Sequence, residues 1–441
     1  MDIPDKILIV GLGATGIATA KFLSRMGKYI TITDTKDETS LTDALAELKG
    51  IEFDGHFGGH RKDDFLSHRL IVISPGVDSE LPELVEARQN GIKVTGEIEL
   101  ASEFVDDPII AITGTNGKTT VTSLIGEIFK KAYGDVFVGG NIGNPLFNYI
   151  LSGKRASYVI LEISSFQLET IDAFHPKNAV LLNITEDHLD RYRSYNDYIK
   201  AKCRIFENQD KDDFAILNSN LEHIKDIKAR RLFFAADRIL AEGAFYDKGN
   251  MHVRINDREF IYKRDLSALV GIHNTENMLA ALLVSHLNGI EQGIAEEVLS
   301  NFRGLAHRVE LVRKLNGITF YNDSKATNVD ATRRALESID QKVILIAGGK
   351  DKGGSYKLIA DIMNRVKGMV LIGEAKQRIY EEIGNLTETY MENNLEDAIR
   401  RAYKLASAGD IVLFSPMCSS FDMFRDYKER GNVFKDIVGL L

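Results

Sequence analysis

Residues 109–120 read IIAITGTNGKTT, and this stretch decides the fold of the central part of the chain. Residues 109–113 predict a buried strand, residues 114–118 form a loop bounded by glycines, and a helix is expected from Thr119 onward. Strand, glycine loop, Lys-Thr pair and helix are the parts of a phosphate cradle, because backbone N–H groups and the positive end of the helix face the phosphates. The stretch therefore predicts a nucleoside triphosphate site.

The candidate ATP-binding residues of this loop are Gly114, Thr115, Asn116, Gly117, Lys118, Thr119 and Thr120. In such loops the lysine, here Lys118, reaches the outer phosphates, and the hydroxyl of Thr119 can ligate Mg²⁺. The match to G-x-x-x-x-G-K-[ST] is imperfect, because Gly114 stands only three residues before Gly117. A tight strand-to-helix turn with a solvated lysine is the alternative interpretation.

Composition bounds the class of protein. A length of 441 residues predicts about three domains, and 44% hydrophobic with 27% charged residues is typical of soluble globular chains. No apolar run approaches the length of a membrane span, and the acidic start MDIPDKILIVG is not a signal peptide. Cys203 and Cys418 have neither disulfide-framework nor metal-ligand spacing, so we expect a cytoplasmic protein. The net charge of −9, without a basic block, argues against nucleic acid as a main partner.

The N-terminal stretch carries a second glycine motif. A predicted strand at residues 7–10 leads into Gly11-x-Gly13-x-x-Gly16 and a helix, and a second strand ends at Asp34. This is the dinucleotide fingerprint, which suggests NAD, although any ligand with a diphosphate and a ribose could use the same helix terminus and acid. A turn at residues 71–77 could line the same crevice. A fold-only turn without a ligand is the remaining alternative.

Polar residues follow predicted strands in the central part of the chain. Glu162 ends a strand that begins at residue 158, and a strand within residues 179–192 ends at Asp187-His188. Carboxyl ends of parallel strands converge on one crevice, so Glu162 and His188 should meet the phosphates held by Lys118. A carboxylate there can hold Mg²⁺; alternatively, Glu162 is a helix N-cap or a surface acid, and His188 satisfies a turn.

Two predicted helices carry further candidates. Residues 196–209 predict a helix, in which Lys202, taken alone, would be a surface lysine. The helix at residues 270–289 opens with polar side chains, and Asn277 could pair with a base edge or cap the helix.

The last third repeats the pattern of apolar strands followed by polar loops, which predicts another doubly wound sheet. The fold class is thus α/β with three domains: a Rossmann-like domain at 1–96, a central P-loop mononucleotide-binding parallel sheet at 97–303, and a Rossmann-like domain at 304–441.

Eight motifs occur in a fixed order: GTNGKTT, GGNIG, LEISSFQLE, NITEDHLDRY, AKCRIFEN, GLAHRVE, NDSKATN and SPMCSSFDMF. In this order they resemble the Mur ligase family over essentially the whole chain, and SSFQLE, DSKATN and SPMCSSFDMF resemble its D-glutamate-adding members. The resemblance implies that the three domains hold a UDP-linked substrate, ATP and the incoming amino acid. It implies an ATP-dependent amide ligase of peptidoglycan synthesis that adds D-glutamate to UDP-N-acetylmuramoyl-L-alanine through an acyl phosphate. The expected partners are small molecules, and we expect a monomer.

The resemblance also assigns residues to sites. It implies catalytic roles for Lys118, His188 and Lys202, with Thr119 and Glu162 on one Mg²⁺ and His188 on a second. Lys202 matches a carbamylated lysine of the family; a carbamate supplies the oxygen that Mg²⁺ requires and an ammonium lacks. Beyond the loop, the implied ATP contacts are Asn277, Arg308, Asp323 and Lys325.

The remaining implied positions contact the two other substrates. Those facing the UDP substrate are Ala14, Thr15, Asp34, Thr35, Lys36, Gly76, Asn141 and Ser164. Those facing D-glutamate are Thr327, Lys352, Ser420, Phe421 and Tyr427. Lys36 stands where relatives carry an arginine and so loses the planar fork of that side chain. Tyr427 stands where phenylalanine is expected.

Three alternatives are weighed against this hypothesis. A sister ligase would add a different amino acid with the same chemistry. An NAD-dependent dehydrogenase would use Asp34 and the first glycine motif but leaves the phosphate loop unexplained. A non-enzymatic nucleotide switch would not need Lys202 or Lys352.

Overall fold

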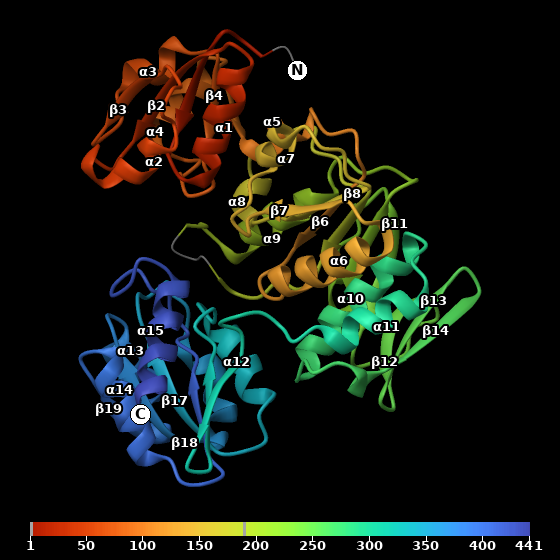
Figure 1. Ribbon diagram of the computed structural model, residues 1–441, viewed down its shortest axis with the longest axis vertical. Coiled ribbons are helices and arrows are strands. Elements are labelled where there is room, and N and C mark those ends of the chain that lie inside the picture. The colour runs from red at the N-terminus through yellow and green to blue at the C-terminus, as the bar shows by residue number, and fades with distance from the viewer. Residues whose placement is uncertain (1–2, 188–190) are drawn as a thin grey trace. The chain divides into compact units, whose positions relative to one another are not determined.

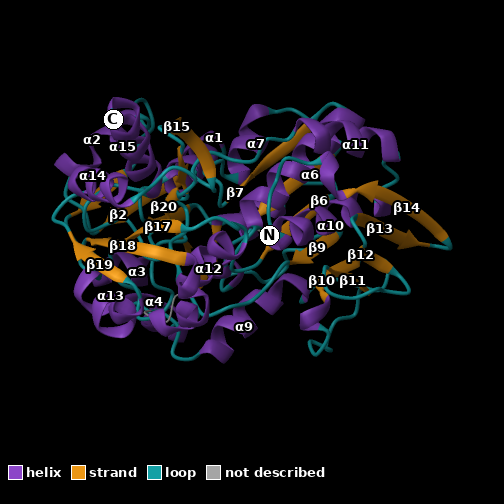
Figure 2. Cartoon of the chain, turned by 90° about the horizontal axis from the view of Figure 1, so that it is seen from below, coloured by secondary structure: helices purple, strands orange, loops and turns teal. Residues whose placement is uncertain are grey.

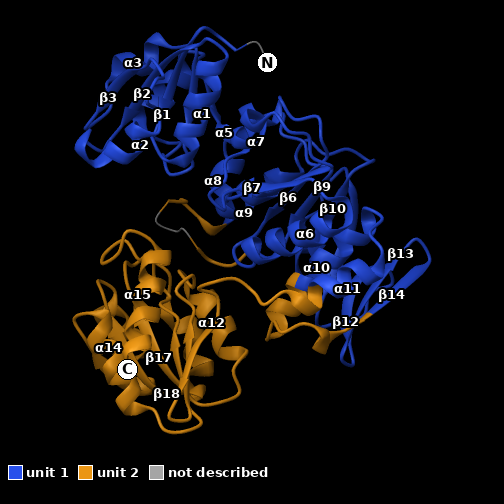
Figure 3. Ribbon diagram, viewed as in Figure 1, with its two compact units in different colours: residues 1–183, 196–261, 278–298 blue, residues 184–195, 262–277, 299–441 orange. Residues whose placement is uncertain are grey.

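A computed structural model describes residues 3–187 and 191–441, and three β-sheets flanked by helices organise these residues (Figure 1). The chain divides into two compact units (Figure 3). Unit 1 comprises residues 1–183, 196–261 and 278–298, and unit 2 comprises residues 184–195, 262–277 and 299–441. Unit 1 contains the first sheet and the second except for the end of its last strand, at residues 262–263, and unit 2 contains the third sheet.

The N-terminal sheet is wholly parallel, with the strand order β3-β2-β1-β4-β5. Its strands are β1 (Lys6–Val10), β2 (Tyr29–Asp34), β3 (Asp54–Phe57), β4 (Leu70–Ile73) and β5 (Lys93–Gly96). Its helices are α1 (Ala14–Arg25), α2 (Thr42–Ala46), α3 (Lys62–Ser67) and α4 (Pro82–Gln89). The apolar strands β1 and β4 lie side by side at the centre and are almost wholly buried, as expected for a parallel sheet covered by helices. This arrangement confirms the predicted Rossmann-like α/β domain.

The central sheet has nine strands in the order β14-β13-β12-β11-β10-β9-β6-β8-β7, with β14 at its free edge (Figure 2). Its strands are β6 (Ile109–Thr113), β7 (Val136–Gly140), β8 (Tyr158–Glu162), β9 (Asn178–Leu181), β10 (Phe214–Asn218), β11 (Arg230–Ala235), β12 (Gly243–Asp247), β13 (Asn250–Ile255) and β14 (Arg258–Lys263). Strands β7 to β12 pair in parallel, and β13 turns back antiparallel to β12. The phosphate-loop strand β6 lies between β9 and β8, where the carboxyl ends of three parallel strands meet.

The helices of the central part are α5 (Glu97–Ser102), α6 (Lys118–Tyr133), α7 (Leu146–Ser152), α8 (Ser165–Leu168), α9 (Tyr195–Cys203), α10 (Ile272–Leu287) and α11 (Gln292–Asn301). Within unit 1, α1 packs against α7, where the rings of Phe22 and Phe147 stack with centroids 4.3 Å apart. This aromatic contact joins the first sheet to the second.

Two predicted elements are shorter in the structure. The helix expected at residues 196–209 ends at Cys203, and a 3-10 turn, Arg204–Phe206, follows it. Asn208 and Gln209 lie beyond this turn and donate side-chain hydrogen bonds to carbonyl groups elsewhere, so they do not extend the helix. The strand expected within residues 179–192 ends at Leu181, so Asp187 lies on a loop six residues further on. His188 lies outside the described residues.

The C-terminal sheet has the order β15-β16-β20-β17-β18-β19. Its strands are β15 (Glu310–Leu315), β16 (Ile318–Asn322), β17 (Val343–Gly348), β18 (Val366–Ile372), β19 (Glu388–Met391) and β20 (Ile411–Phe414), and its helices are α12 (Val329–Glu337), α13 (Lys376–Ile383), α14 (Leu395–Leu405) and α15 (Tyr427–Leu440). Only β15 is antiparallel to its neighbour. Alternate residues of β17 enter two different cores, Val343 and Leu345 in one and Ile344 and Ile346 in the other. Helices therefore cover both faces of this sheet, which confirms the predicted doubly wound fold.

Across the described residues, none of the helices has the length and apolar character needed to span a bilayer.

Candidate functional site

The phosphate loop connects β6 to α6 and depends on two glycines with positive φ. The φ angle is 153° at Gly114 and 86° at Gly117, and a Cβ on Gly114 would lie 3.0 Å from the Cβ of Leu182. Gly117 is the N-cap of α6, so the positive end of the dipole of a long helix lies at the loop. Lys118 Nζ donates to the carbonyl oxygens of Gly114 at 2.8 Å and Thr115 at 2.9 Å. The backbone geometry is that of a phosphate cradle, and α6 begins at Lys118, one residue earlier than expected.

Asn183, just beyond the end of the neighbouring strand β9, supports the loop. Its side-chain oxygen accepts from the N–H of Asn116 at 2.8 Å, its side-chain N–H₂ donates to the Asn116 carbonyl at 3.0 Å, and its backbone carbonyl accepts from Thr115 N at 2.9 Å. Asn183 was not among the predicted site residues. A polar side chain just beyond a strand is the pattern that selected Glu162, and the same pattern could have found it.

Lys202 is buried beside the phosphate loop. Its side chain belongs to a residue only 2% exposed, Nζ donates to the Gly114 carbonyl at 2.9 Å, and the ammonium lies 4.5 Å from the centroid of the Tyr198 ring. The hydroxyl of Tyr198 shares a hydrogen bond of 3.1 Å with Thr115 Oγ1. The prediction of a surface lysine is therefore wrong: positions 198 and 202 are one helical turn apart, and this face of α9 packs on the loop.

Glu162 ends β8 in register with Ile112 of β6, and it is 3% exposed. One oxygen, Oε1, accepts from Asn141 Nδ2 at 2.9 Å. The other, Oε2, is buried and has no hydrogen-bond partner among the described residues. A buried carboxylate oxygen with its lone pairs unused is the kind of ligand that Mg²⁺ takes, so Glu162 fits a Mg²⁺ site, whereas the ammonium of Lys202 fits one only after conversion to an oxygen donor.

The alternative roles considered for Glu162 are both wrong. Burial excludes a surface acid. The N-cap of α8 is Ser164, whose hydroxyl accepts from Gln167 N at 3.2 Å while the Gln167 side chain accepts from Ser164 N at 2.9 Å. This capping box gives Ser164 a structural role besides its predicted contact with substrate.

The N-terminal glycine motif packs as its spacing predicts. Gly11 has a φ of 92°, and a Cβ on Gly16 would lie only 2.1 Å from the Gly11 carbonyl oxygen. Asp34 holds this turn: its two oxygens accept from Leu12 N at 2.8 Å and from Lys36 N at 2.9 Å. Ala14 and Thr15 open α1, Thr35 and Lys36 follow β2, and Gly76 follows β4, so the predicted UDP-substrate residues of this sheet share its carboxyl edge.

Unit 2 contains the other predicted nucleotide contacts, Asn277, Arg308, Asp323 and Lys325. Asp323 accepts from Val309 N at 3.2 Å and from Ser415 Oγ at 2.7 Å, and burial raises the pKa of its carboxyl to about 7. These bonds bring the loop that carries Arg308 against the end of β16. Asn277 is buried and donates to Asn274 Oδ1 at 3.1 Å.

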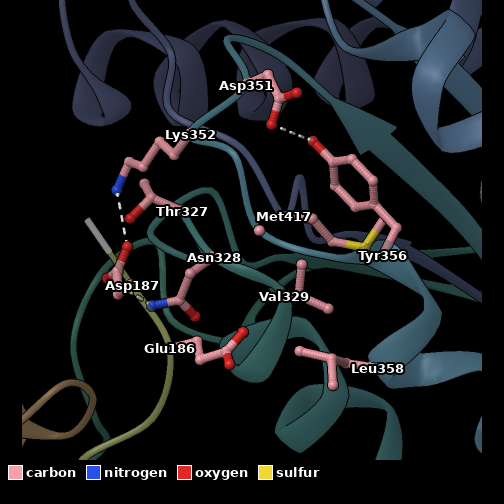
Figure 4. Close-up of a pocket in the computed structure, with 11 residues that line it drawn as sticks. Glu186, Asp187, Thr327, Asn328, Val329, Asp351, Lys352, Tyr356, Leu358 and Met417 are labelled. Carbon is pink, nitrogen blue, oxygen red and sulfur yellow. Dashed lines mark hydrogen bonds and ion pairs between the residues drawn. The ribbon is translucent and has the colours of Figure 1, made fainter. Parts of the chain in front are cut away.

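A pocket within unit 2 contains two predicted D-glutamate residues, Thr327 and Lys352 (Figure 4). In Figure 4 the Lys352 ammonium points toward Asp187, with Nζ 3.5 Å from Oδ1. Asn328 Nδ2 donates to the other oxygen of the same carboxylate at 2.9 Å. Within this pocket a cation and an amide group therefore hold the side chain of Asp187. Asn328 was not predicted, because it also caps α12 and its sequence pattern indicates only a helix start.

The remaining predicted D-glutamate residues, Ser420, Phe421 and Tyr427, lie between the end of β20 and the start of α15. Ser420 is buried and Phe421 is 68% exposed, whereas Tyr427 opens α15 with Lys325 Nζ 3.8 Å from its ring centroid. Backbone hydrogen bonds between Lys350 and Ser419, of 2.9 and 3.2 Å, join this loop to the one that carries Lys352. None of the three belongs to the lining of the pocket in Figure 4 as far as residues 3–187 and 191–441 define it.

Fold and site together define a class of protein: a chain in which a phosphate loop on a central, mostly parallel sheet is preceded and followed in sequence by Rossmann-like domains. The sequence matches the Mur ligase MurD-like N-terminal domain over residues 5–96, the Mur ligase middle domain over 112–285 and the Mur ligase glutamate ligase domain over 307–418. The chain belongs to the Mur ligase family.

Relatives within this family match almost end to end. A protein of Geotalea daltonii named UDP-N-acetylmuramoylalanine–D-glutamate ligase is 50% identical, covering 99% of this chain and 97% of the relative. One of Clostridioides difficile with the same name is 41% identical, covering 99% and 98%.

Solved structures share the fold at low sequence identity. The UDP-N-acetylmuramate–alanine ligase MurC of Thermotoga maritima superposes with a TM-score of 0.63 at 21% identity, covering 99% of both chains. A pseudomurein peptide ligase type C of Methanothermus fervidus also gives a TM-score of 0.63, at 18% identity, covering 99% of this chain and 100% of its own.

Proposed function

We propose that this chain is an ATP-dependent ligase that adds D-glutamate to UDP-N-acetylmuramoyl-L-alanine in the synthesis of peptidoglycan precursors. One observation carries the proposal: relatives up to 50% identical, matching from end to end, are named UDP-N-acetylmuramoylalanine–D-glutamate ligase. A loop suited to phosphate and a pocket that contains the cation of Lys352 support the proposal, because the reaction uses ATP and an anionic amino acid.

The reaction forms an amide between two anionic substrates in two steps, with cleavage of ATP to ADP and phosphate. A carboxylate oxygen of the L-alanyl group forms a bond to the γ-phosphorus of ATP while the bond from that phosphorus to ADP breaks. The amine of D-glutamate then bonds to the acyl carbon, loses a proton, and the carbon–oxygen bond to phosphate breaks. The products are the amide, ADP and phosphate.

Lys118 and the N-terminus of α6 offset the repulsion between the attacking carboxylate and the triphosphate. Glu162 and Thr119 would hold Mg²⁺, which neutralises charge on the phosphate oxygens when bound. Lys202 would serve as an oxygen donor in its carbamylated form, and His188, outside the described residues, is the proposed ligand of a second Mg²⁺.

The sites for D-glutamate and for the UDP moiety are assigned to different sheets. Lys352 and Thr327 would hold a carboxylate of D-glutamate. The carboxyl edge of the N-terminal sheet would hold the UDP moiety, with domain boundaries near residues 96 and 303. We also assign the reaction to the cytoplasm, where ATP is available, and to a monomer.

The deciding experiment measures ADP release by the purified protein with ATP, Mg²⁺ and UDP-N-acetylmuramoyl-L-alanine, in parallel with D-glutamate, L-glutamate, L-alanine or no amino acid. Turnover with D-glutamate alone is expected. Turnover only with another amino acid would make this a sister ligase, and NADH binding without any turnover would favour the dehydrogenase.

A further inference from the structure

Arg204 binds a group of carbonyl oxygens that follow α8. Its Nη1 donates to Leu168 O at 2.9 Å and Glu169 O at 2.7 Å, and its Nη2 donates to Ile171 O at 2.7 Å. These carbonyls lie at and beyond the end of a helix, where no later N–H of the helix can reach them. A planar guanidinium with five N–H groups can satisfy several such acceptors at once.

The residues after Arg204 continue this interaction in order along the same segment. Asn208 Nδ2 donates to Asp172 O at 2.9 Å and Phe174 O at 3.1 Å, and Gln209 Nε2 donates to Pro176 O at 3.0 Å. Residues 204–209 are therefore fastened to residues 168–176 through side chain–backbone bonds, all within unit 1.

The opposite side of the segment is held by Glu99. Its carboxylate accepts from the N–H groups of Asp172 at 2.9 Å, Ala173 at 2.8 Å and Phe174 at 2.9 Å. Glu99 thus binds N–H groups of residues 168–176, and the side chains of residues 204–209 bind carbonyl groups of the same segment. These bonds fix the position of the segment, so it can in turn hold the residues that bind to it.

Arg204 lies close in sequence to a residue of the proposed active site. It begins the turn directly after α9, two residues beyond Lys202, whose Nζ reaches the Gly114 carbonyl. The anchored segment follows α8 and thus Glu162 at the end of β8. Arg204 consequently ties the end of α9, and with it Lys202, to the segment that follows α8. Glu162 ends β8, in register with Ile112 of the strand that precedes the phosphate loop.

We propose that Arg204 is a positioning residue of the ligase site: by binding the carbonyls of Leu168, Glu169 and Ile171 it holds the end of α9 so that Lys202 stays beside the phosphate loop. This inference rests on the proposed function for the identity of the site. Arg204 itself contacts neither nucleotide nor metal in this scheme; it acts through the placement of Lys202.

The test uses Arg204→Gln and Arg204→Lys in the full-length protein, with two readouts. Binding of Mn²⁺, as a spectroscopic probe of the Mg²⁺ site in the presence of ADP, is titrated by electron paramagnetic resonance, and kcat and KM are measured by ADP release. Loss of a group that orients a metal ligand typically costs about 10–100-fold in metal affinity or activity, so we expect Arg204→Gln to raise the Kd for Mn²⁺ and lower kcat by about that factor. KM for the UDP substrate should not change.

Two variants serve as matched controls. Asn208→Ala removes two bonds to the same segment but lies six residues from Lys202, and Glu207→Gln removes the carboxylate that accepts from Arg204 Nε at 2.7 Å. Both should keep the wild-type Kd for Mn²⁺, with thermal unfolding showing whether Asn208→Ala costs stability.

Wild-type Mn²⁺ affinity and kcat in folded Arg204→Gln would overturn the inference, as would an equal loss in Asn208→Ala. If Arg204→Gln does not fold, Arg204→Lys decides by the same criteria, because it keeps the charge and can reach fewer carbonyls. A wild-type protein without D-glutamate-dependent ADP release would refute the proposed function, while the Mn²⁺ titration would still decide the role of Arg204.

Discussion

Lys202 lies in a polar stretch of sequence, yet its ammonium is buried against a carbonyl oxygen and an aromatic ring. Burial of a charge is costly unless the group is paired or chemically changed. The Gly114 carbonyl and the Tyr198 ring are two of the groups that compensate this charge. The buried Oε2 of Glu162, which has no hydrogen-bond partner among the described residues, is a separate polar group whose burial is not compensated by the protein.

Replacement of this lysine tests its proposed role. We expect Lys202→Ala to lose most ligase activity, because an oxygen ligand of Mg²⁺ is lost, and to regain part of it when acetate or another short-chain carboxylate is added. ADP release with and without the carboxylate is the measurement. Lys200→Ala is the control, since that side chain is exposed on the same helix; full activity of Lys202→Ala would refute the role.

Lys352 gives a prediction about substrate affinity. Its ammonium pairs with Asp187 in a pocket that also contains Thr327. A hydrogen bond between charged groups contributes about 1.5–3 kcal/mol, so Lys352→Met should raise KM for D-glutamate by about 10–100-fold. KM for ATP should remain at the wild-type value. The exposed Lys350, replaced in the same way, should change neither constant, and an unchanged KM for D-glutamate in Lys352→Met would remove Lys352 from the amino-acid site.

Among the secondary-structure elements, α5 illustrates how a short helix is held at a junction. It begins at Glu97 directly after β5, and the Glu97 carboxylate accepts from Phe147 N at 2.8 Å. Burial raises the pKa of this carboxyl to about 7. The folded protein therefore binds this proton more tightly than the unfolded chain does, so stability is complete below the unfolded pKa and declines as pH rises toward 7.

Glu97→Gln should remove that decline, because the amide keeps an acceptor oxygen and has no proton to lose. Between pH 5 and pH 8 we expect the unfolding free energy of the wild type to fall by about 2 kcal/mol more than that of the variant. Urea unfolding at both pH values, with the exposed Glu103→Gln as control, provides the comparison. Parallel pH dependence in wild type and Glu97→Gln would show that this carboxyl does not titrate in that range.

The elements differ in how well local sequence predicts them. The strands β1, β6, β8 and β17 are uninterrupted apolar runs that end at glycines or polar residues, and all were predicted. Residues 182–187 and 207–209 were assigned to regular elements and do not belong to them. At Asn183, Asn208 and Gln209 the side chains bind distant backbone groups instead of continuing the local pattern.

At the scale of the whole molecule, the proposed reaction draws on both compact units. The phosphate loop belongs to unit 1, and Thr327 and Lys352 belong to unit 2. Since the amine must reach an acyl carbon activated by ATP, the substrates require groups of both units at one place. We expect the radius of gyration in solution scattering to fall when an ATP analogue, the UDP substrate and D-glutamate are all present. Identical curves for the free and the fully liganded protein would contradict this expectation.

Much of the candidate site was accessible from sequence. The phosphate loop, the first glycine motif, Glu162 and the polar loop ends of the last sheet follow from local patterns, because glycine conformation, strand ends and helix starts are decided by neighbouring residues. The ordered motifs predicted the family, which the comparisons confirm. The individual substrate contacts remain predictions.

Other properties were decided only by the tertiary structure. The burial of Lys202, the unpaired oxygen of Glu162 and the fastening of Arg204 to the carbonyls after α8 depend on segments that approach from elsewhere in the chain. Asp187 and Lys352 meet although 165 residues separate them. Local sequence specifies the conformation of a segment and the chemistry of its side chains; the solvent exposure and partners of those side chains are set by packing between distant segments, which no local pattern contains.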